Sequence, residues 1–178
     1  MGEDVTIADA RLAFLHQYWR GKKQGRSMPS PVDIDPAELP AVIQPNVMVL
    51  DVVGAADGPR FRYRRVGGVF WRAGGTDLAG RFVAEVLPVK AGYRDYVVGI
   101  YREMAETKRP MYTENVFILQ HGQVDPMSTK RVSLPLSYDG TRVDGVLAAH
   151  VFDYGGAGGD DGFILVTAIK EDVRAFLD

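Results

Sequence analysis

The chain has 178 residues, 46% of them hydrophobic, and its 21 basic and 23 acidic residues give a net charge of -2. This length predicts one domain with its own core, and the near balance of charge argues against nucleic acid or an anionic membrane as a partner. Cysteine is absent, which excludes disulfides, thiol nucleophiles and thiolate metal sites. No apolar run reaches the roughly 18 residues of a spanning helix and the N-terminus is acidic, so a soluble, cytoplasmic protein is expected.

Residues 6–21 are the first predicted element, an amphipathic helix. At about 100° per residue, its apolar side chains fall within an arc of roughly 160°. The stripe has two interpretations: it packs on its own domain, as most apolar stripes do, or it forms a dimer interface. The residues of that dimer interface would be Leu12, Leu15, Tyr18 and Trp19.

The segment after this helix is predicted to be an arm followed by two strands. Residues 22–33 are basic and rich in proline and serine, which favours a surface arm. A helix-start signal follows, in which Asp35 caps and Pro36 takes the first helical position. Residues 46–53 and 60–66 are then predicted as strands, and the second is expected at an edge because it alternates aromatic residues with arginine.

A longer amphipathic helix is predicted over residues 90–107, after short helical pieces within residues 67–88. Its apolar arc spans about 140° and consists of Tyr93, Tyr96, Val97, Ile100, Tyr101 and Met104. Residues 111–120 are expected to form the third strand.

Residues 129–154 are predicted to be a hairpin of two strands. Asp139 and Gly140 supply the turn, since glycine adopts a positive φ without a Cβ clash. The second strand is apolar on both sides, which predicts a central place in its sheet. Pro135 cannot donate to a ladder, so a bulge is predicted there.

The tail allows two interpretations. Residues 155–162, GGAGGDDG, are predicted to be a flexible connector and do not match the dinucleotide-binding fingerprint. The β-branched content of residues 163–169 fits a sixth strand, whereas the apolar residues of the tail also fit one helical stripe. We favour a helix from about Ile169 onward.

Helix, two strands, short helices, a long helix and three strands is the element order of a PAS domain. Over residues 11–153 the chain resembles an alphaproteobacterial family of small PAS-like proteins, in the runs WRGKKQGRSMPSPVDIDPAELPAVIQPNVMVLDV, FRYRRVGGVF, DLAGR, ETKRP and RVSLPLSYDGTRVDGVLA. The resemblance implies an α+β fold with a five-stranded antiparallel sheet in the order 2-1-5-4-3 and helices on one face. We add N-terminal and C-terminal helices, and divide the chain into a helix and arm (1–45), a PAS-like core (46–154) and a connector with a C-terminal segment (155–178).

Several kinds of PAS chemistry are excluded by composition. Flavin–cysteinyl adducts and thioester-linked chromophores need a cysteine, and the haem-ligating histidine of some PAS domains has no counterpart on the long helix. The three histidines, His16, His121 and His150, lack the spacing of a metal site or a catalytic triad, so no metal, cofactor or catalytic residue is expected. One alternative is an acid–base dyad of Asp51 and His150, if the strands that carry them pair.

What remains is a non-covalent pocket between the sheet and the long helix, mostly apolar with a few polar groups. Arg131 would pair with a ligand carboxylate there, or lie on the wet side of its strand. The candidate ligand-binding residues are Phe70, Trp71, Tyr93, Tyr96, Val97, Ile100, Tyr101, Asn115, Phe117, Arg131, Ser133, Leu147 and His150.

The expected function is that of a homodimeric sensory or regulatory domain, not an enzyme, that binds a small organic ligand or a partner signalling protein. One alternative is a protein-interaction module with a filled core. The other is a small cavity enzyme of the isomerase or dehydratase type.

Overall fold

The computed structural model describes residues 5–54, 56–73, 77–87, 89, 92–119, 127–153 and 166–178, and shows an α+β fold built on one antiparallel sheet. The sheet runs in the order β2-β1-β5-β4-β3-β6. Its strands are β1 (Val47–Val53), β2 (Arg60–Val66), β3 (Met111–Leu119), β4 (Met127–Leu136), β5 (Gly145–Asp153) and β6 (Val166–Phe176). The helices are α1 (Ala10–Lys22), α2 (Val83–Val86) and α3 (Tyr93–Thr107), with short 3₁₀ helices η1 (Pro31–Asp33), η2 (Pro36–Glu38), η3 (Gln44–Asn46) and η4 (Gly68–Ala73).

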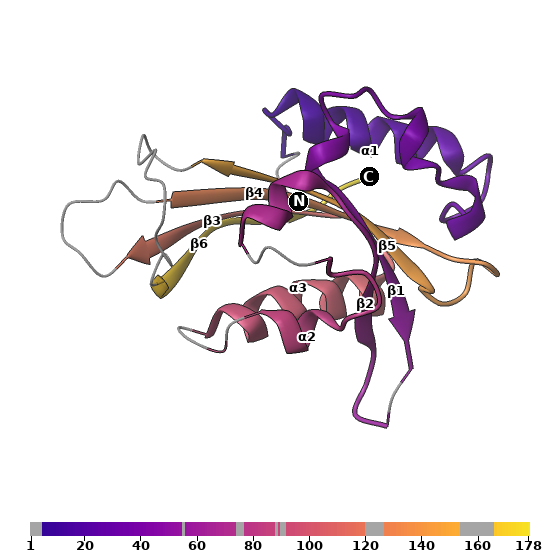
Figure 1. The fold of residues 1–178 in the computed structure, drawn as a ribbon. Helices are drawn as coiled ribbons and strands as arrows, with labels where there is room; N and C mark the ends of the chain where they lie inside the picture. Colours follow the sequence, from indigo (N-terminus) through magenta and orange to yellow (C-terminus); the bar gives the residue numbers. More distant parts are fainter. Residues whose placement is uncertain are drawn as a thin grey trace.

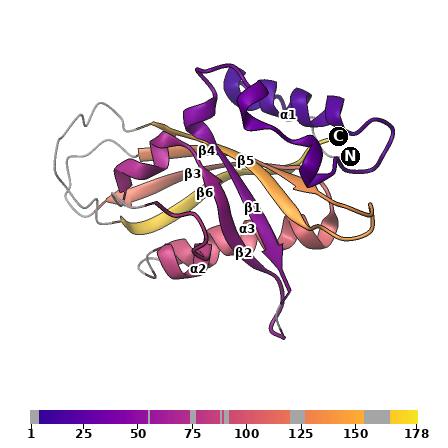
Figure 2. The ribbon, with the colours of Figure 1, turned by 45° about the vertical axis from the view of Figure 1, so that its right-hand side comes forward.

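Helices cover both faces of the sheet. Figure 1 shows α1 and the arm after it on one face and α2 and α3 on the other, and the turned view in Figure 2 shows the same three layers. Each face has its own cluster of buried apolar side chains. Because successive residues of a strand point to opposite faces, one strand supplies both clusters: Val47 and Val49 of β1 pack under α1, while Met48 and Leu50 pack under α3.

The predicted five-stranded sheet is wrong in strand count and in its outer strand. The strands named in the prediction follow one another as β2-β1-β5-β4-β3, but β6 pairs with β3 beyond them, so β3 lies inside the sheet. The C-terminal helix expected from Ile169 is therefore a strand. The spacing of its apolar side chains fits a helix as well as a strand. The edge of β3 decides between the two, because a strand that pairs there satisfies a row of backbone donors and acceptors.

The predictions for the edge and the centre of the sheet are confirmed. β2 is the outermost strand at its end, and β5 lies between β1 and β4 with its first six residues buried. The turn prediction for the β4–β5 connection is also confirmed: Gly140 has a φ of 77°, and the Asp139 carboxylate accepts from the Thr141 amide at 2.8 Å. These backbone donors hold the pKa of Asp139 well below its usual range.

No bulge occurs at Pro135, where one was predicted. Its register with β5 is regular, and β3 begins at Met111, opposite Ser133. Pro135 therefore has a ladder neighbour on one side only, and its missing N–H removes no bond on the open side. The Pro135 carbonyl accepts a hydrogen bond from the Trp19 indole Nε1 at 2.8 Å.

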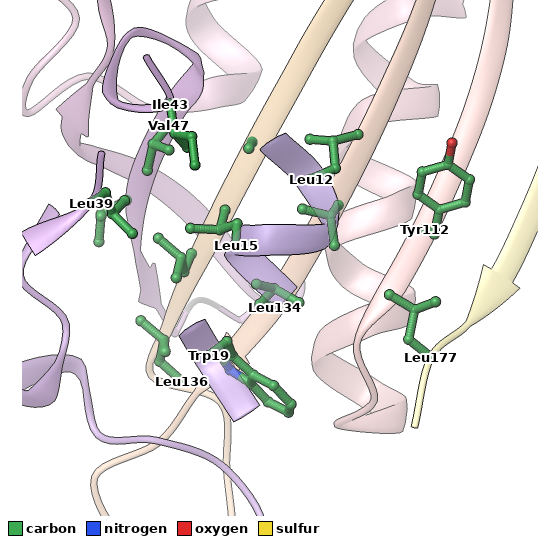
Figure 3. Close-up of a cluster of buried hydrophobic side chains, with 14 of the residues drawn as sticks. Leu12, Leu15, Trp19, Leu39, Ile43, Val47, Tyr112, Leu134, Leu136 and Leu177 are labelled. Carbon is green, nitrogen blue, oxygen red and sulfur yellow. The ribbon is translucent and has the colours of Figure 1, made fainter. Parts of the chain in front are cut away.

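The apolar side chains of α1 pack on the chain's own sheet. Asp9 caps the helix by accepting from the amides of its first turn. Leu12, Leu15 and Trp19 are at most 1% exposed and lie over β4 and its neighbours (Figure 3). The proposed dimer interface is thus corrected for these three residues, which are buried within one chain, while the half-buried Tyr18 donates to Glu38 of η2.

α3 lies across the opposite face. Its buried residues are Val97, Ile100, Tyr101 and Met104, whose spacing places them on one side of the helix. Lys108, with a φ of 56°, ends the helix in the left-handed conformation. Within the described residues, no helix has both the length and the apolar character that crossing a membrane requires.

Candidate ligand-binding site

The register of three strands brings six polar side chains together on the α3 face of the sheet. β5, β4 and β3 align His150, Arg131 and Thr113 in one row, and the next row holds Thr129 beside Asn115. Ser133 lies two residues after Arg131, on the same face of β4. All six side chains are buried, although polar side chains are rarely enclosed without partners. We call these six residues the polar row.

Arg131 is the centre of the polar row and is 0% exposed. Its Nε donates to His150 Nε2 at 3.0 Å and its Nη1 donates to Thr113 Oγ1 at 3.2 Å. These two hydrogen bonds run to the neighbouring strands on either side and fix the plane of the guanidinium. The remaining nitrogen, Nη2, is buried without a hydrogen-bond partner.

His150 is neutral in this environment. Burial, followed by the positive charge of Arg131, holds the pKa of His150 well below 6.5. An arginine nitrogen is always a donor, so His150 Nε2 must be the acceptor and the ring proton resides on Nδ1. The site therefore contains one fixed positive charge and one neutral imidazole.

Tyr101 connects the polar row to α3. Its hydroxyl lies 3.2 Å from His150 Nε2 and 3.7 Å from Met48 Sδ. Since the single lone pair of His150 Nε2 already accepts from Arg131, the one hydroxyl proton is donated to the sulfur. Burial raises the pKa of Tyr101 to about 12, although the charge of Arg131 opposes the shift. The phenol therefore stays protonated and acts as a donor at neutral pH.

Four side chains of the polar row carry buried polar atoms without a partner. They are both amide atoms of Asn115, the hydroxyls of Thr129 and Ser133, and Arg131 Nη2. Most buried polar side-chain atoms in proteins have at least one partner, and an unpaired one costs about 1–3 kcal/mol. Because these atoms come from neighbouring positions on one face of β3 and β4, together they offer donors and acceptors for one bound molecule.

Aromatic rings lie beside the polar row at the β5 side. The Phe70 ring contacts His150 edge to face, with centroids 5.1 Å apart, and lies 5.8 Å from Phe152. Phe70 belongs to η4, which follows Gly67. A Cβ at Gly67 would lie 2.3 Å from the Pro45 carbonyl oxygen, so glycine permits the close approach between η4 and η3 that places Phe70 here.

The β6 side of the polar row is closed by an ion-pair network. Arg174 pairs with Glu171 of its own strand and with Glu103 of α3. The half-buried Tyr96 lies by this network: burial raises its pKa to about 12, Arg131 lowers it, and Glu171 adds to the rise. Arg174 thus holds both acidic side chains at this edge in ion pairs.

The structure brings together many of the predicted ligand-binding residues. Tyr101, Asn115, Arg131, Ser133 and His150 meet at the polar row, with Phe70 against His150. The other predicted residues of α3 lie in the apolar cluster on the same face: Tyr93, Tyr96, Val97 and Ile100. The side chains of Trp71 and Phe117, like the whole of His121, lie outside the described residues.

Leu147 was predicted wrongly, and two members of the polar row were missed. Leu147 packs in the cluster under α1, because it stands three positions from His150 and so points to the opposite face. Thr113 and Thr129 were missed. Both share the alternation of Asn115 and Arg131 along their strands, and that signal was sufficient to find them.

The alternative acid–base dyad of Asp51 and His150 is wrong. β1 and β5 pair as that hypothesis required, but Asp51 lies opposite Gly145, five positions from His150 and hence about 17 Å along the strand. Asp51 instead forms ion pairs with Arg62 and Arg64 of β2. His150 lacks a carboxylate partner among the described residues.

Other binding features are slight in the described part of the chain. No group of three or more metal-ligating side chains occurs among the described residues. A surface pocket between β2, α2 and α3 has a volume of about 30 Å³, room for one or two water molecules.

Compared with known proteins, the chain matches no family model, no curated protein and no solved structure.

Proposed function

We propose that this chain is a PAS-like sensory or regulatory domain that binds a small organic ligand between its sheet and α3, without chemistry of its own. The observation that carries the proposal is the polar row, in which buried polar atoms from four adjacent side chains have no protein partner. A bound ligand would supply those partners, and the free energy of binding would include the recovery of hydrogen bonds that the chain itself lacks.

The surroundings of the polar row support a binding role over a catalytic one. His150 is neutral and engaged with Arg131 and Tyr101, and Tyr101 keeps its proton at neutral pH. A general base needs a free lone pair, and here the one unprotonated nitrogen of His150 already accepts from Arg131. In this proposal, ligand binding alters the contact between α3 and the sheet, and a homodimer mate or a partner signalling protein reads that change.

A thermal-shift screen of the full chain against small organic acids, amines, amides and neutral compounds tests the proposal. A ligand present at 100 times its Kd adds about 2.7 kcal/mol to the free energy of unfolding, which gives a clear rise in Tm. The substitution Ser133→Leu places a larger apolar side chain within the polar row and should abolish that rise, whereas Ser27→Leu, on the exposed arm, should preserve it.

A filled core would give a different result. If no compound raised Tm, or if Ser133→Leu retained the full rise, the chain would instead be a protein-interaction module. Catalytic turnover by the wild-type chain that His150→Ala abolished would favour the cavity enzyme.

A further inference from the structure

We infer that the ligand of the polar row is a monocarboxylate with an apolar body, whose carboxylate pairs with Nη2 of Arg131; this inference rests on the proposed function and names its ligand class. The starting observation is that Arg131 is completely buried and has no acidic partner among the described residues. Guanidinium is never deprotonated in proteins, so the positive charge persists inside the fold.

The cost of that charge indicates an anion. A buried ion without a counterion carries a desolvation penalty of several kcal/mol, and buried charges in proteins are normally paired. The neutral contacts to His150 and Thr113 satisfy two nitrogens but supply no negative charge. Glu103 and Glu171 form ion pairs with Arg174 at the β6 edge, and neither forms one with Arg131.

The charge count selects a monoanion. Arg131 contributes one positive charge and His150 contributes none, so a singly charged group neutralises the site. A phosphate monoester, which carries about -1.5 to -2 at neutral pH, would leave negative charge enclosed in the fold. A carboxylate carries a single charge and matches the geometry of arginine N–H donors.

The other members of the polar row distinguish an organic acid from a simple ion. The Asn115 amide and the hydroxyls of Thr129 and Ser133 provide further unpaired donors and acceptors next to Arg131. Chloride can use only donors, whereas a carboxylate with a polar substituent can use both. Phe70 and Phe152 offer apolar surface at the β5 side for the body of the ligand.

The test compares the dialysed full chain with the variants Arg131→Met and Arg131→Lys. The probes are sodium acetate, butyrate, 2-hydroxybutyrate and benzoate, each measured by thermal shift and calorimetry against sodium chloride and sodium phosphate at equal ionic strength. At least one carboxylate should raise the Tm of the wild-type chain above both salts. Loss of the charge-assisted contact in Arg131→Met should weaken that binding about 10- to 100-fold.

Three variants separate a ligand contact from a structural role. Arg131→Met without ligand should melt at or above the wild-type temperature, because it removes an uncompensated buried charge. Arg131→Lys keeps the charge and should retain weakened carboxylate binding even if the methionine variant fails to fold. Arg142→Met is the matched control: it removes an exposed arginine paired with Asp144 and should bind carboxylates like the wild type.

The outcomes distinguish this inference from the proposed function. The inference is wrong if the carboxylates raise Tm no more than chloride or phosphate does. It is also wrong if Arg131→Met leaves carboxylate binding unchanged. A neutral or cationic compound that stabilised the wild type and Arg131→Met equally would contradict the carboxylate ligand class. The proposed ligand-binding function would then still stand. If neither the carboxylates nor any compound of the wider screen shifted Tm, the carboxylate inference and the proposed function would both be wrong.

Discussion

On the α1 face of the sheet the buried side chains are almost all apolar, whereas the α3 face divides into an apolar half and the polar row. The same strands build both faces, since β4 presents Val132 and Leu134 to α1 but Arg131 and Ser133 to α3. On the α1 face Trp19 finds a carbonyl for its N–H, and His16 carries the one buried unpaired side-chain atom described there. The first face stabilises the fold, and the second departs from stable packing where a ligand is proposed to bind.

The largest expected effect belongs to the α1 face. Leu15 is 0% exposed, so Leu15→Ala removes buried methyl groups and leaves a cavity, which should lower the free energy of unfolding by about 2–5 kcal/mol. Chemical denaturation measures this change. Ligand binding per molecule of folded protein should be unaffected. A small loss of stability would contradict the assignment of this face as the filled core.

A second effect concerns pH and the α3 face. The pKa of His150 is depressed in the folded chain, while in the unfolded chain it lies near 6.5, so below about pH 6.5 the unfolded state binds more protons. Stability is therefore complete above that pH and should fall as the pH drops, by up to about 2 kcal/mol at pH 5 from this residue.

Denaturation curves of the wild type and His150→Gln across this range check the prediction. The glutamine oxygen can accept from Arg131, but glutamine does not titrate. The free energy of unfolding of the variant should therefore fall less steeply than that of the wild type as the pH drops. His16→Gln tests the same effect on the other face, where burial also lowers a histidine pKa. Equal slopes for the wild type and His150→Gln would show that His150 is not buried as a neutral ring.

A smaller effect of opposite sign is expected within the polar row. Thr129 is 0% exposed and its hydroxyl has no partner, so Thr129→Val replaces it with a group of similar shape and no polar atom. The ligand-free variant should gain about 1 kcal/mol in the free energy of unfolding. Thr141→Val in the exposed β4–β5 connection serves as the control. A loss of stability in Thr129→Val would mean that the hydroxyl has a partner in solution.

Local sequence signals predicted the elements whose structure depends on neighbouring residues. The turn at Gly140, the two-sided apolar strand β5 and the amphipathic helices follow from periodicity and turn chemistry. β6 could not be decided in this way, because its apolar residues fit either pattern and its pairing depends on the distant edge of β3. The missing bulge at Pro135 has the same origin: β3 stops short of it.

The polar row was predicted in part for a related reason. Arg131, Asn115 and Ser133 were recognised as polar residues of a candidate pocket, but the alignment of Arg131 between His150 and Thr113 depends on the register of three strands. Sequence does not fix that register. The error on Leu147 was avoidable, because residues an odd number of positions apart in a strand lie on opposite faces.

The most direct measurement is native mass spectrometry of the full chain after gentle purification, compared with the 19.6 kDa mass of the polypeptide. The account predicts a complex heavier by one small organic molecule, which acid denaturation releases and which Ser133→Leu fails to retain. The mass of the bare polypeptide alone in the wild type, with no compound restoring the complex when added back, would contradict it.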